Sequence, residues 1–342
     1  MFLVNKMRLI NMKKEINIED IKDAASLIRD SKLVIFPTET VYGIGANGLD
    51  DKAVKSIFVA KGRESDNPLI LHVSSYEMIE RVAKNINSIE KRLIDVFFPG
   101  PLTIILDKKD IVPTSVTAGL DTVGVRMPSN KIANLLIKYA DVPIAAPSAN
   151  ASGKPSGANT QDIICEFKDS VSCIIDGGST DIGLESTVVR VVDGKVKILR
   201  PGKISSEDFI AHGFLVELDK NVFRNVNKTD KVMSPGMKYR HYAPLKKCLL
   251  IYSDDNTKLI KEILKYENAL VVCRSSNVKF FKNTIDMGES LEDISHNIFH
   301  ILREVDKTNF DLVIIEGVKK EGLGVAIMNR LIRACSHNYI EL

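Results

Sequence analysis

Basic and small polar residues follow short apolar segments at several places along the chain. In "KGR", Lys61 and Arg63 flank a glycine just after a segment with helical periodicity. Lysine supplies a point charge and arginine a planar fork of donors, so the pair suits an anion with several oxygens, such as a polyphosphate. The alternative is a solvated basic turn. The loop "APSANASGKPSG" (146–157) adds small donors for phosphate oxygens: Ser148, Asn150, Ser152 and Ser156.

Two further side chains lie within apolar segments. Arg126 is in the middle of "DTVGVRMP" (121–128), and a guanidinium is not buried without a partner. The expected partner is a carboxylate, which belongs either to the protein or to an amino-acid substrate. His72 follows the apolar run "LIL", where a core histidine and a pocket histidine are both compatible with the pattern.

The segment "FPTETVYGIGANG" (36–48) shows Thr38, Glu39, Thr40 and Tyr42 directly after a buried strand. Its glycines either permit close approach to a ligand or meet the needs of a turn. A dinucleotide fingerprint is disfavoured because the helix start and the third glycine are misplaced. Other strand ends add further polar residues, namely Ser186, Thr187 and Arg200.

These candidates lack a dedicated nucleophile. No Walker A loop, GxSxG elbow or zincin spacing occurs in the sequence, so we expect no protein metal site and a metal carried by a nucleotide. A site built from cations, hydroxyls and backbone suits nucleotidyl transfer, in which catalysis is mainly positioning and charge stabilisation.

The elements that must position these residues differ between the two halves of the chain. Residues 15 to about 210 mix helical and strand patterns without strict alternation. The stretch 17–30 is a helix that Asn17 can cap, and 186–199 is a hairpin turning at Asp193-Gly194. An α/β fold with a mixed twisted sheet is therefore expected for this part. Beyond residue 246, strands alternate regularly with helices, which predicts a smaller, Rossmann-like parallel sheet.

Composition places few constraints beyond these. The chain has 342 residues with 47 basic and 44 acidic side chains, a near balance that argues against a protein devoted to coating nucleic acid. The five cysteines have no paired spacing, which favours buried free thiols in a cytoplasmic protein. No run approaches the roughly 20 apolar residues of a membrane span.

We expect an N-terminal tail (1–14), a catalytic α/β domain (15–211), an interdomain linker (212–245) and a C-terminal α/β domain (246–342). The linker contains "SPGMKYRHYAP" (234–244), which is too rich in aromatic and basic residues for a mere connector. We interpret it as a lid in which Tyr239 and Arg240 reach a ligand; the alternative is a linker packed between domains.

The combination of these motifs resembles the YrdC-like family. "KGR" (61–63) with "SAN" (148–150) is similar to the KxR…SxN signature of that family. Further blocks match in the family's order over about residues 15 to 211: "PTETVYGIGA", "NPLILHV", "PGPLTIIL", "GVRMP", "APSANASG" and "ESTVV". The linker and "GLGVAIMNRLIRAC" resemble the longer, two-domain form.

The resemblance implies L-threonylcarbamoyladenylate synthesis in a concave cleft of the twisted sheet. By analogy with the family, Arg126 binds the threonine carboxylate, and the rest of the threonine pocket comprises Thr40, His72, Ala146 and Ser186. ATP is bound by Arg63, Asn67, Thr122, Ser148, Ser156, Arg200 and Tyr239. The catalytic set that stabilises phosphate charge is Lys61, Arg63, Ser148 and Asn150.

The substrates implied are L-threonine, bicarbonate or CO2, and ATP with Mg²⁺ carried by the nucleotide. The product would pass to proteins that modify tRNA, with at most weak RNA contact by this chain and no membrane. Two other functions stay open at this point. One is a plain RNA-binding module, and the other is a carbamoyltransferase that forms carbamoyladenylate, although this chain lacks the CxxC pairs of the latter.

Overall fold

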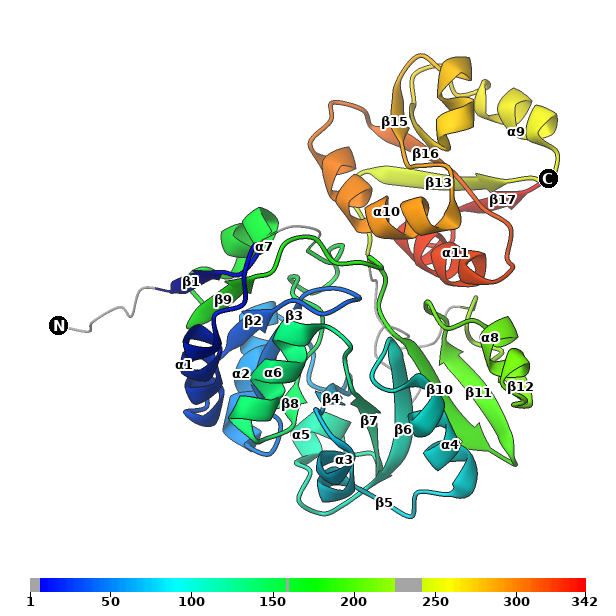
Figure 1. Cartoon of the computed structure of the whole chain (residues 1–342). Coiled ribbons are helices and arrows are strands. Elements are labelled where there is room, and N and C mark those ends of the chain that lie inside the picture. The colour runs from blue at the N-terminus through cyan, green and yellow to red at the C-terminus, as the bar shows by residue number, and fades with distance from the viewer. Residues whose placement is uncertain (1–6, 158–159, 225–241) are drawn as a thin grey trace.

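The chain folds around two β-sheets, shown in the computed structural model of Figure 1, which describes residues 7–157, 160–224 and 242–342. Within these residues the larger sheet has 12 strands. In spatial order its strands are β1 (Arg8–Asn11), β9 (Cys173–Asp176), β2 (Val34–Phe36), β3 (Gly43–Asn47), β8 (Ile144–Ala145), β4 (Ile70–His72), β7 (Thr122–Arg126), β6 (Leu102–Lys108), β10 (Thr187–Val192), β11 (Lys195–Arg200) and β12 (Val216–Leu218), with β5 (Ala83–Lys84) beside β6.

The larger sheet is mixed, as the irregular order of helical and strand patterns predicted. Strands β4 and β7 pair in parallel, whereas β3 and β8, and β6 and β7, pair in antiparallel fashion. The predicted hairpin is formed by β10 and β11. Its turn residues Asp193 and Gly194 have φ of 49° and 74°, the positive values that a type I′ turn requires.

Helices cover this sheet with their apolar faces. They are α1 (Ile18–Arg29), α2 (Asp51–Lys61), α3 (Tyr76–Val82), α4 (Ser88–Phe97), α5 (Thr114–Thr117), α6 (Lys131–Ala140), α7 (Thr160–Phe167) and α8 (Ser206–Ala211). In α1, the Asn17 side chain accepts from the backbone N–H groups of Glu19 and Asp20, so the predicted cap is confirmed. The helix buries Ile21 and Ile28 against the core at the spacing its periodicity predicted.

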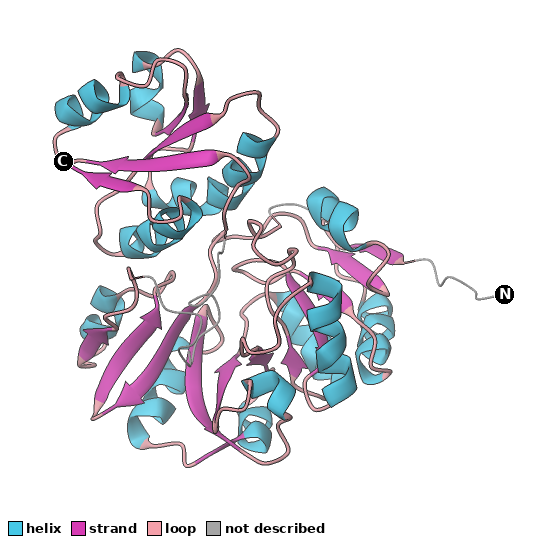
Figure 2. Ribbon diagram, turned by 180° about the vertical axis from the view of Figure 1, so that it is seen from behind, coloured by secondary structure: helices cyan, strands magenta, loops and turns pink. Residues whose placement is uncertain are grey.

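The second sheet is parallel throughout its described strands. Its order is β15 (Thr284–Asp286), β14 (Leu270–Cys273), β16 (Leu312–Glu316), β13 (Lys247–Tyr252) and β17 (Tyr339–Glu341). One face packs on α9 (Asn256–Ile263), next to the short 3-10 helix η1 (Ser275–Phe280). The other packs on α10 (Leu291–Asp306) and α11 (Leu323–Ala334), which lie between the two sheets (Figure 1, Figure 2). The predicted parallel α/β arrangement is therefore confirmed.

The two halves share apolar contacts. Val41 and Leu184, from loops of the larger sheet, are buried in the same cluster as Ile298 of α10 and Leu331 of α11. Tyr242, where the described chain resumes, stacks on Phe299 with ring centroids 5.1 Å apart. Helices α10 and α11 of the second half thus pack against the loop that follows β2 and the loop that precedes β10.

The structure corrects several expectations. Part of the expected tail, Arg8–Asn11, is β1 and pairs in parallel with β9. The larger sheet also continues to Leu218 in β12, past the expected boundary at 211. Four of the free cysteines are buried, but Cys165 is exposed. The division of the chain into a catalytic domain, a linker and a C-terminal domain stays a prediction.

Two of the glycines near β3 are required by packing and not by a ligand. A Cβ at Gly45 would lie 2.6 Å from Cε1 of Phe36, and one at Gly48 would lie 2.5 Å from Cδ2 of Leu71. Gly43, in contrast, is in the wall of the pocket described below.

No helix in the described part of the chain is both long and apolar enough to cross a membrane.

Candidate functional site

A pocket of about 770 Å³, partly open to solvent, lies at strand ends near the centre of the larger sheet. Most of the residues singled out from the sequence line it. They are Thr38, Thr40, Tyr42, Lys61, Arg63, His72, Arg126, Ala146, Ser148, Asn150, Ser152, Ser186 and Arg200. These residues come from loops and from the ends of helices and strands that are up to 162 positions apart in the chain, since Arg200 follows Thr38 by that distance. The strand order of the sheet therefore brings the separate motifs together.

Lys61 is held at the end of α2 beside the loop that follows β8. Gly62, with φ of 58°, ends the helix in the left-handed conformation and leaves Lys61 in the last turn. The Lys61 Nζ donates to the backbone carbonyls of Ser148 and Asn150, each at 2.5 Å. Burial, and then the charge of Arg63, lower the pKa of the Lys61 ammonium well below its ordinary value. The lysine thus binds the loop, and its amine is shielded from solvent.

The loop after β8 has an internal hydrogen-bond network. The Ser148 Oγ donates to the Asn150 Oδ1 at 2.6 Å, and the Asn150 amide nitrogen donates to the carbonyls of Ala151 and Lys154. A backbone bridge joins Ser148 to Gly43 of β3. The hydroxyl hydrogen of Ser148 and both amide hydrogens of Asn150 are thus donated within the loop, so the network fixes the shape of the loop.

Arg126 has a carboxylate of the protein as its partner. Its Nη2 lies 2.8 Å from the Glu39 Oε1, and its Nη1 donates to the Thr40 Oγ1 at 2.8 Å. Burial alone would raise the pKa of the Glu39 carboxyl, but the charge and hydrogen bond of Arg126 hold it below its ordinary value. The sequence left open whether the carboxylate partner of Arg126 belongs to the protein or to a substrate, and the structure shows a carboxylate of the protein. Arg126 also lines the pocket, so the guanidinium faces both Glu39 and the open space.

His72 is the neighbour of Arg126 across the parallel β4–β7 pair. Its ring makes an edge contact with Phe36, and its centroid lies 6.3 Å from that of Phe36. Burial, and then the charge of Arg126, lower the pKa of His72 to about 3. The imidazole is therefore neutral at physiological pH. Of the two alternatives for His72, a core histidine and a pocket histidine, the structure shows the second, because His72 lines the pocket.

Ser186 and Arg200 form another part of the wall. The Arg200 Nη2 donates to the Ser186 Oγ at 3.1 Å and its Nε donates to the Ser186 carbonyl at 3.1 Å. Burial lowers the pKa of Arg200 to about 10, which still leaves it charged at neutral pH. The adjacent Glu185 accepts from the Arg330 Nε of α11 at 2.9 Å, so the second half of the chain reaches the pocket wall.

Three predicted residues lie outside the pocket lining. Asn67 is buried next to the lining residue Pro68, and its carbonyl lies 3.4 Å from the Arg63 Nη2. Thr122 starts β7, whereas Arg126 ends it. The Ser156 Oγ donates to the Glu185 Oε1 at 3.3 Å. Tyr239 and Arg240 lie outside the described residues.

Sequence reasoning missed two lining residues with polar side chains, Glu185 and Tyr242. Glu185 precedes Ser186 in "LEST", and a carboxylate beside a predicted anion site was the available signal. Tyr242 belongs to the expected lid segment and is buried beneath the guanidinium of Arg330, 5.7 Å from ring centroid to Cζ. The aromatic content of that segment was the signal that could have identified it.

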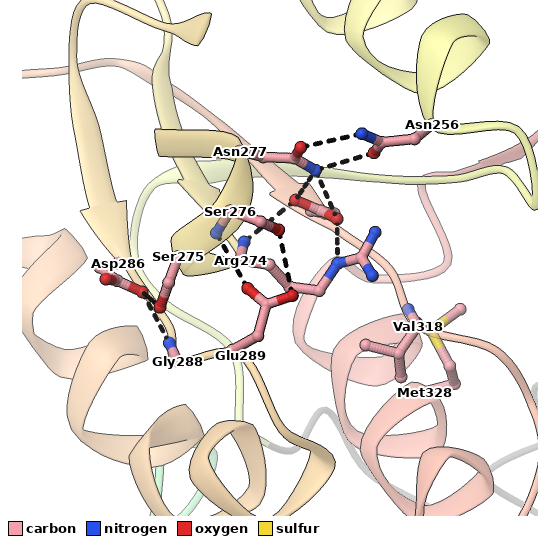
Figure 3. A network of polar contacts seen from close by, with 11 residues as sticks. Asn256, Arg274, Ser275, Ser276, Asn277, Asp286, Gly288, Glu289, Val318 and Met328 are labelled. Carbon is pink, nitrogen blue, oxygen red and sulfur yellow. Dashed lines mark hydrogen bonds and ion pairs between the residues drawn. The ribbon is translucent and has the colours of Figure 1, made fainter. Parts of the chain in front are cut away.

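A second polar cluster lies at the carboxyl ends of the strands in the smaller sheet (Figure 3). Glu316 is fully buried there and accepts from the Arg274 Nε at 2.5 Å and from the Asn277 amide at 3.0 Å. Asn256 in turn exchanges hydrogen bonds with Asn277. Because the buried carboxylate is satisfied by the protein, this cluster is structural. Among the described residues, no group of three or more His, Cys, Asp or Glu side chains could hold a metal.

The fold and the pocket define an α/β protein whose mixed sheet gathers cationic and hydroxyl side chains around one pocket. Residues 26–202 match the Sua5/YciO/YrdC family, whose description is telomere recombination. Residues 204–336 match the C-terminal domain of threonylcarbamoyl-AMP synthase. The chain therefore belongs to the Sua5/YciO/YrdC family, in its two-part form.

Relatives match over almost the whole chain. A threonylcarbamoyl-AMP synthase of Pyrococcus abyssi is 42% identical, and the alignment covers 98% of this chain and 99% of the relative. That of Bacillus subtilis is 38% identical with the same coverage. Among solved structures, P. abyssi Sua5 in complex with L-threonine has a TM-score of 0.90 at 42% identity and covers 98% of this chain and 99% of its own.

Proposed function

We propose that this pocket combines L-threonine, bicarbonate (or CO2) and ATP into threonylcarbamoyl-AMP and pyrophosphate, as part of tRNA modification. One observation carries the proposal: Arg126, His72 and Thr40 share a single pocket with Lys61 and Arg63. Full-length similarity to two threonylcarbamoyl-AMP synthases supports it. An amino acid and a polyphosphate can therefore bind next to each other, which the reaction requires.

In this proposal, Arg126 binds the threonine carboxylate. Glu39 and Thr40 orient the guanidinium, and the pocket keeps it away from bulk water, which strengthens its attraction for a carboxylate. Neutral His72 contributes a ring nitrogen without adding charge. The rest of the threonine site comprises Thr40, Ala146 and Ser186.

The triphosphate of ATP binds where the cations and the loop after β8 meet. Lys61, Arg63 and Arg200 would supply the cationic side chains, and Ser148 and Asn150 would turn their donors from the loop toward the phosphates when ATP binds. Four other residues complete the ATP site as predictions: Asn67, Thr122, Ser156 and Tyr239. Mg²⁺ arrives with the nucleotide and binds phosphate oxygens and water. The acidic residue of the described lining, Glu185, is already paired with Arg330.

The reaction follows from this placement. The neutral threonine amine attacks the carbon of CO2 with release of a proton, or the carbon of bicarbonate with loss of water, to form a carbamate. A carbamate oxygen then attacks the α-phosphorus of ATP in line, and the bond to pyrophosphate breaks. Lys61 and Arg63 stabilise the charge that builds up on the phosphate oxygens. The protein needs no covalent intermediate.

The product is a mixed anhydride, which water hydrolyses. The segment 234–244 would act as a lid that excludes water, and Tyr242 at its described end already forms part of the pocket wall. The product would pass to proteins that transfer threonylcarbamoyl to tRNA in the cytoplasm.

Pyrophosphate release from the purified protein tests the proposal. We expect release only when ATP, bicarbonate and L-threonine are all present, and much less with L-valine, which replaces the threonine hydroxyl by a methyl group. Threonine-independent release, or turnover that needs carbamoyl phosphate, would support a carbamoyltransferase instead. Binding of RNA without any turnover would support an RNA-binding module.

A further inference from the structure

The nucleotide loop, defined here as residues 148–157, has no regular secondary structure beyond the single bridge at Ser148. It nevertheless carries Ser148, Asn150 and Ser156, which the proposed function assigns to ATP. A loop of this kind keeps a catalytic geometry only if other parts of the chain hold it. Lys61 holds its first residues, through the carbonyls of Ser148 and Asn150.

The far end of the nucleotide loop is held by Arg303 of α10, in the C-terminal half of the chain. The Arg303 Nη2 donates to the Pro155 carbonyl at 2.7 Å, and its Nε donates to the Ser156 carbonyl at 3.1 Å. The same guanidinium forms an ion pair with Glu166 of α7 at 2.8 Å, from Nη1 to Oε1. All three contacts use the planar fork, which a lysine cannot reproduce.

Glu166 extends this hold to the middle of the loop. Its Oε2 accepts from the backbone N–H of Ala151 at 2.8 Å. The side chains of Glu166 and Arg303 are each 12% exposed, so their ion pair is largely shielded from water and salt. The Arg303–Glu166 pair thus fixes the loop at Ala151, Pro155 and Ser156.

We propose that Arg303 is a positioning residue for the nucleotide loop, so that the C-terminal half completes the ATP site. The proposal rests on the proposed function only in taking ATP as the ligand of this loop. Arg303 does not line the pocket, so it acts through the loop and not by touching the substrate. Its removal should therefore weaken nucleotide binding selectively and leave the threonine site, whose residues all lie outside residues 148–157, intact.

The test uses Arg303→Gln and Arg303→Lys in the full chain. A matched control is Lys203→Gln, because Lys203 also links the two halves, through Glu292 at 2.9 Å, but is far more exposed and holds no part of the loop. Calorimetry measures the affinity of each protein for a non-hydrolysable ATP analogue and, separately, for L-threonine. Circular dichroism establishes that each variant is folded.

We expect Arg303→Gln to weaken binding of the ATP analogue about tenfold, the size expected for losing charge-assisted hydrogen bonds. Arg303→Lys should give an intermediate loss because it keeps the pair with Glu166, and Lys203→Gln should bind like the wild type. The affinity for threonine should change by less than about twofold in all three variants, because the threonine site and the nucleotide loop are independent of each other. If Arg303→Gln does not fold, Glu166→Gln should show the same selective loss.

Unchanged affinity for the analogue, or an equal loss for the analogue and threonine, would overturn the proposal. Because binding is measured directly, the result is readable even if the wild-type protein releases no pyrophosphate. Absence of pyrophosphate release from the wild type would contradict the proposed function but not the role of Arg303 in nucleotide binding.

Discussion

Arg126 and Glu39 form an ion pair in the wall of the pocket, with 2.8 Å between Nη2 and Oε1 and each side chain about 5% exposed. Burying two charges is costly unless their geometry is good, so such a pair is weak evidence for stability by itself. Its position beside open space gives it another role. In the proposed function, Glu39 orients the guanidinium before the threonine carboxylate arrives.

The first prediction concerns Glu39→Gln. Loss of the carboxylate leaves Arg126 buried without its counter-charge, and removing one partner of such a pair costs about 3–5 kcal/mol of unfolding free energy. The threonine carboxylate would then be a substitute partner. We therefore expect a lower melting temperature than wild type, and a larger rise in melting temperature on adding L-threonine. An equal rise in both proteins would contradict the assignment of Arg126 to the threonine carboxylate.

The second prediction concerns acid pH. The pKa of Glu39 is lowered from its ordinary value of 4.5 in the folded protein. Its contribution to stability is therefore complete above about pH 4.5 and is lost as the pH falls through the lower folded value. The difference in unfolding free energy between wild type and Glu39→Gln should stay constant near neutral pH and shrink at acid pH. Denaturant titrations at several pH values measure it, and a difference that grows on acidification would be contrary.

The third prediction concerns His72. Its pKa of about 3 lies below the ordinary 6.5, because the site is buried and faces Arg126. Between these values the unfolded chain binds a proton that the folded protein does not, so His72 lowers stability as the pH falls. In NMR spectra, with His72→Gln to assign the signal, the His72 resonances should not titrate between about pH 5 and 8. A midpoint near the ordinary value would show that the ring is solvated or differently paired.

The fourth prediction concerns Lys61. Lys61→Met removes the charge and both hydrogen bonds to the nucleotide loop, so kcat for pyrophosphate release should fall about 100-fold or more, as for loss of one charge-stabilising donor. Lys61→Arg should not restore the rate, because a planar guanidinium does not replace the compact ammonium between two carbonyls. Lys52→Met, on the exposed face of the same helix, should leave kcat unchanged. Full activity in Lys61→Met would exclude the proposed role.

Local patterns predicted much of the fold and of the site. The helix capped by Asn17 and the hairpin at Asp193-Gly194 follow from signals that lie within a few residues of each other. Strand-end motifs were recognisable because loops at strand ends build sites on α/β sheets. The pocket contains ten of the thirteen different residues to which the resemblance assigned a site role and that lie in the described part of the chain, Asn67, Thr122 and Ser156 being outside its lining.

Features that depend on distant partners could not be predicted. The strand β1 pairs with β9, more than 160 residues later, and the sequence 8–11 alone does not indicate a partner. Arg303 lies in a helix whose periodicity predicted only its apolar face, whereas its contacts are with Glu166, 137 positions away. The partner of Arg126 was open for the same reason, because many carboxylates in the chain could satisfy a guanidinium.

The central claim is that one pocket binds the amino acid and the nucleotide together. A crystal structure with L-threonine and a non-hydrolysable ATP analogue tests it most directly. The account predicts the threonine carboxylate on Arg126 and the triphosphate on Lys61 and Arg63, with the amine facing the α-phosphate in the same cavity. Threonine and nucleotide in separate cavities, or a triphosphate away from the nucleotide loop, would contradict it.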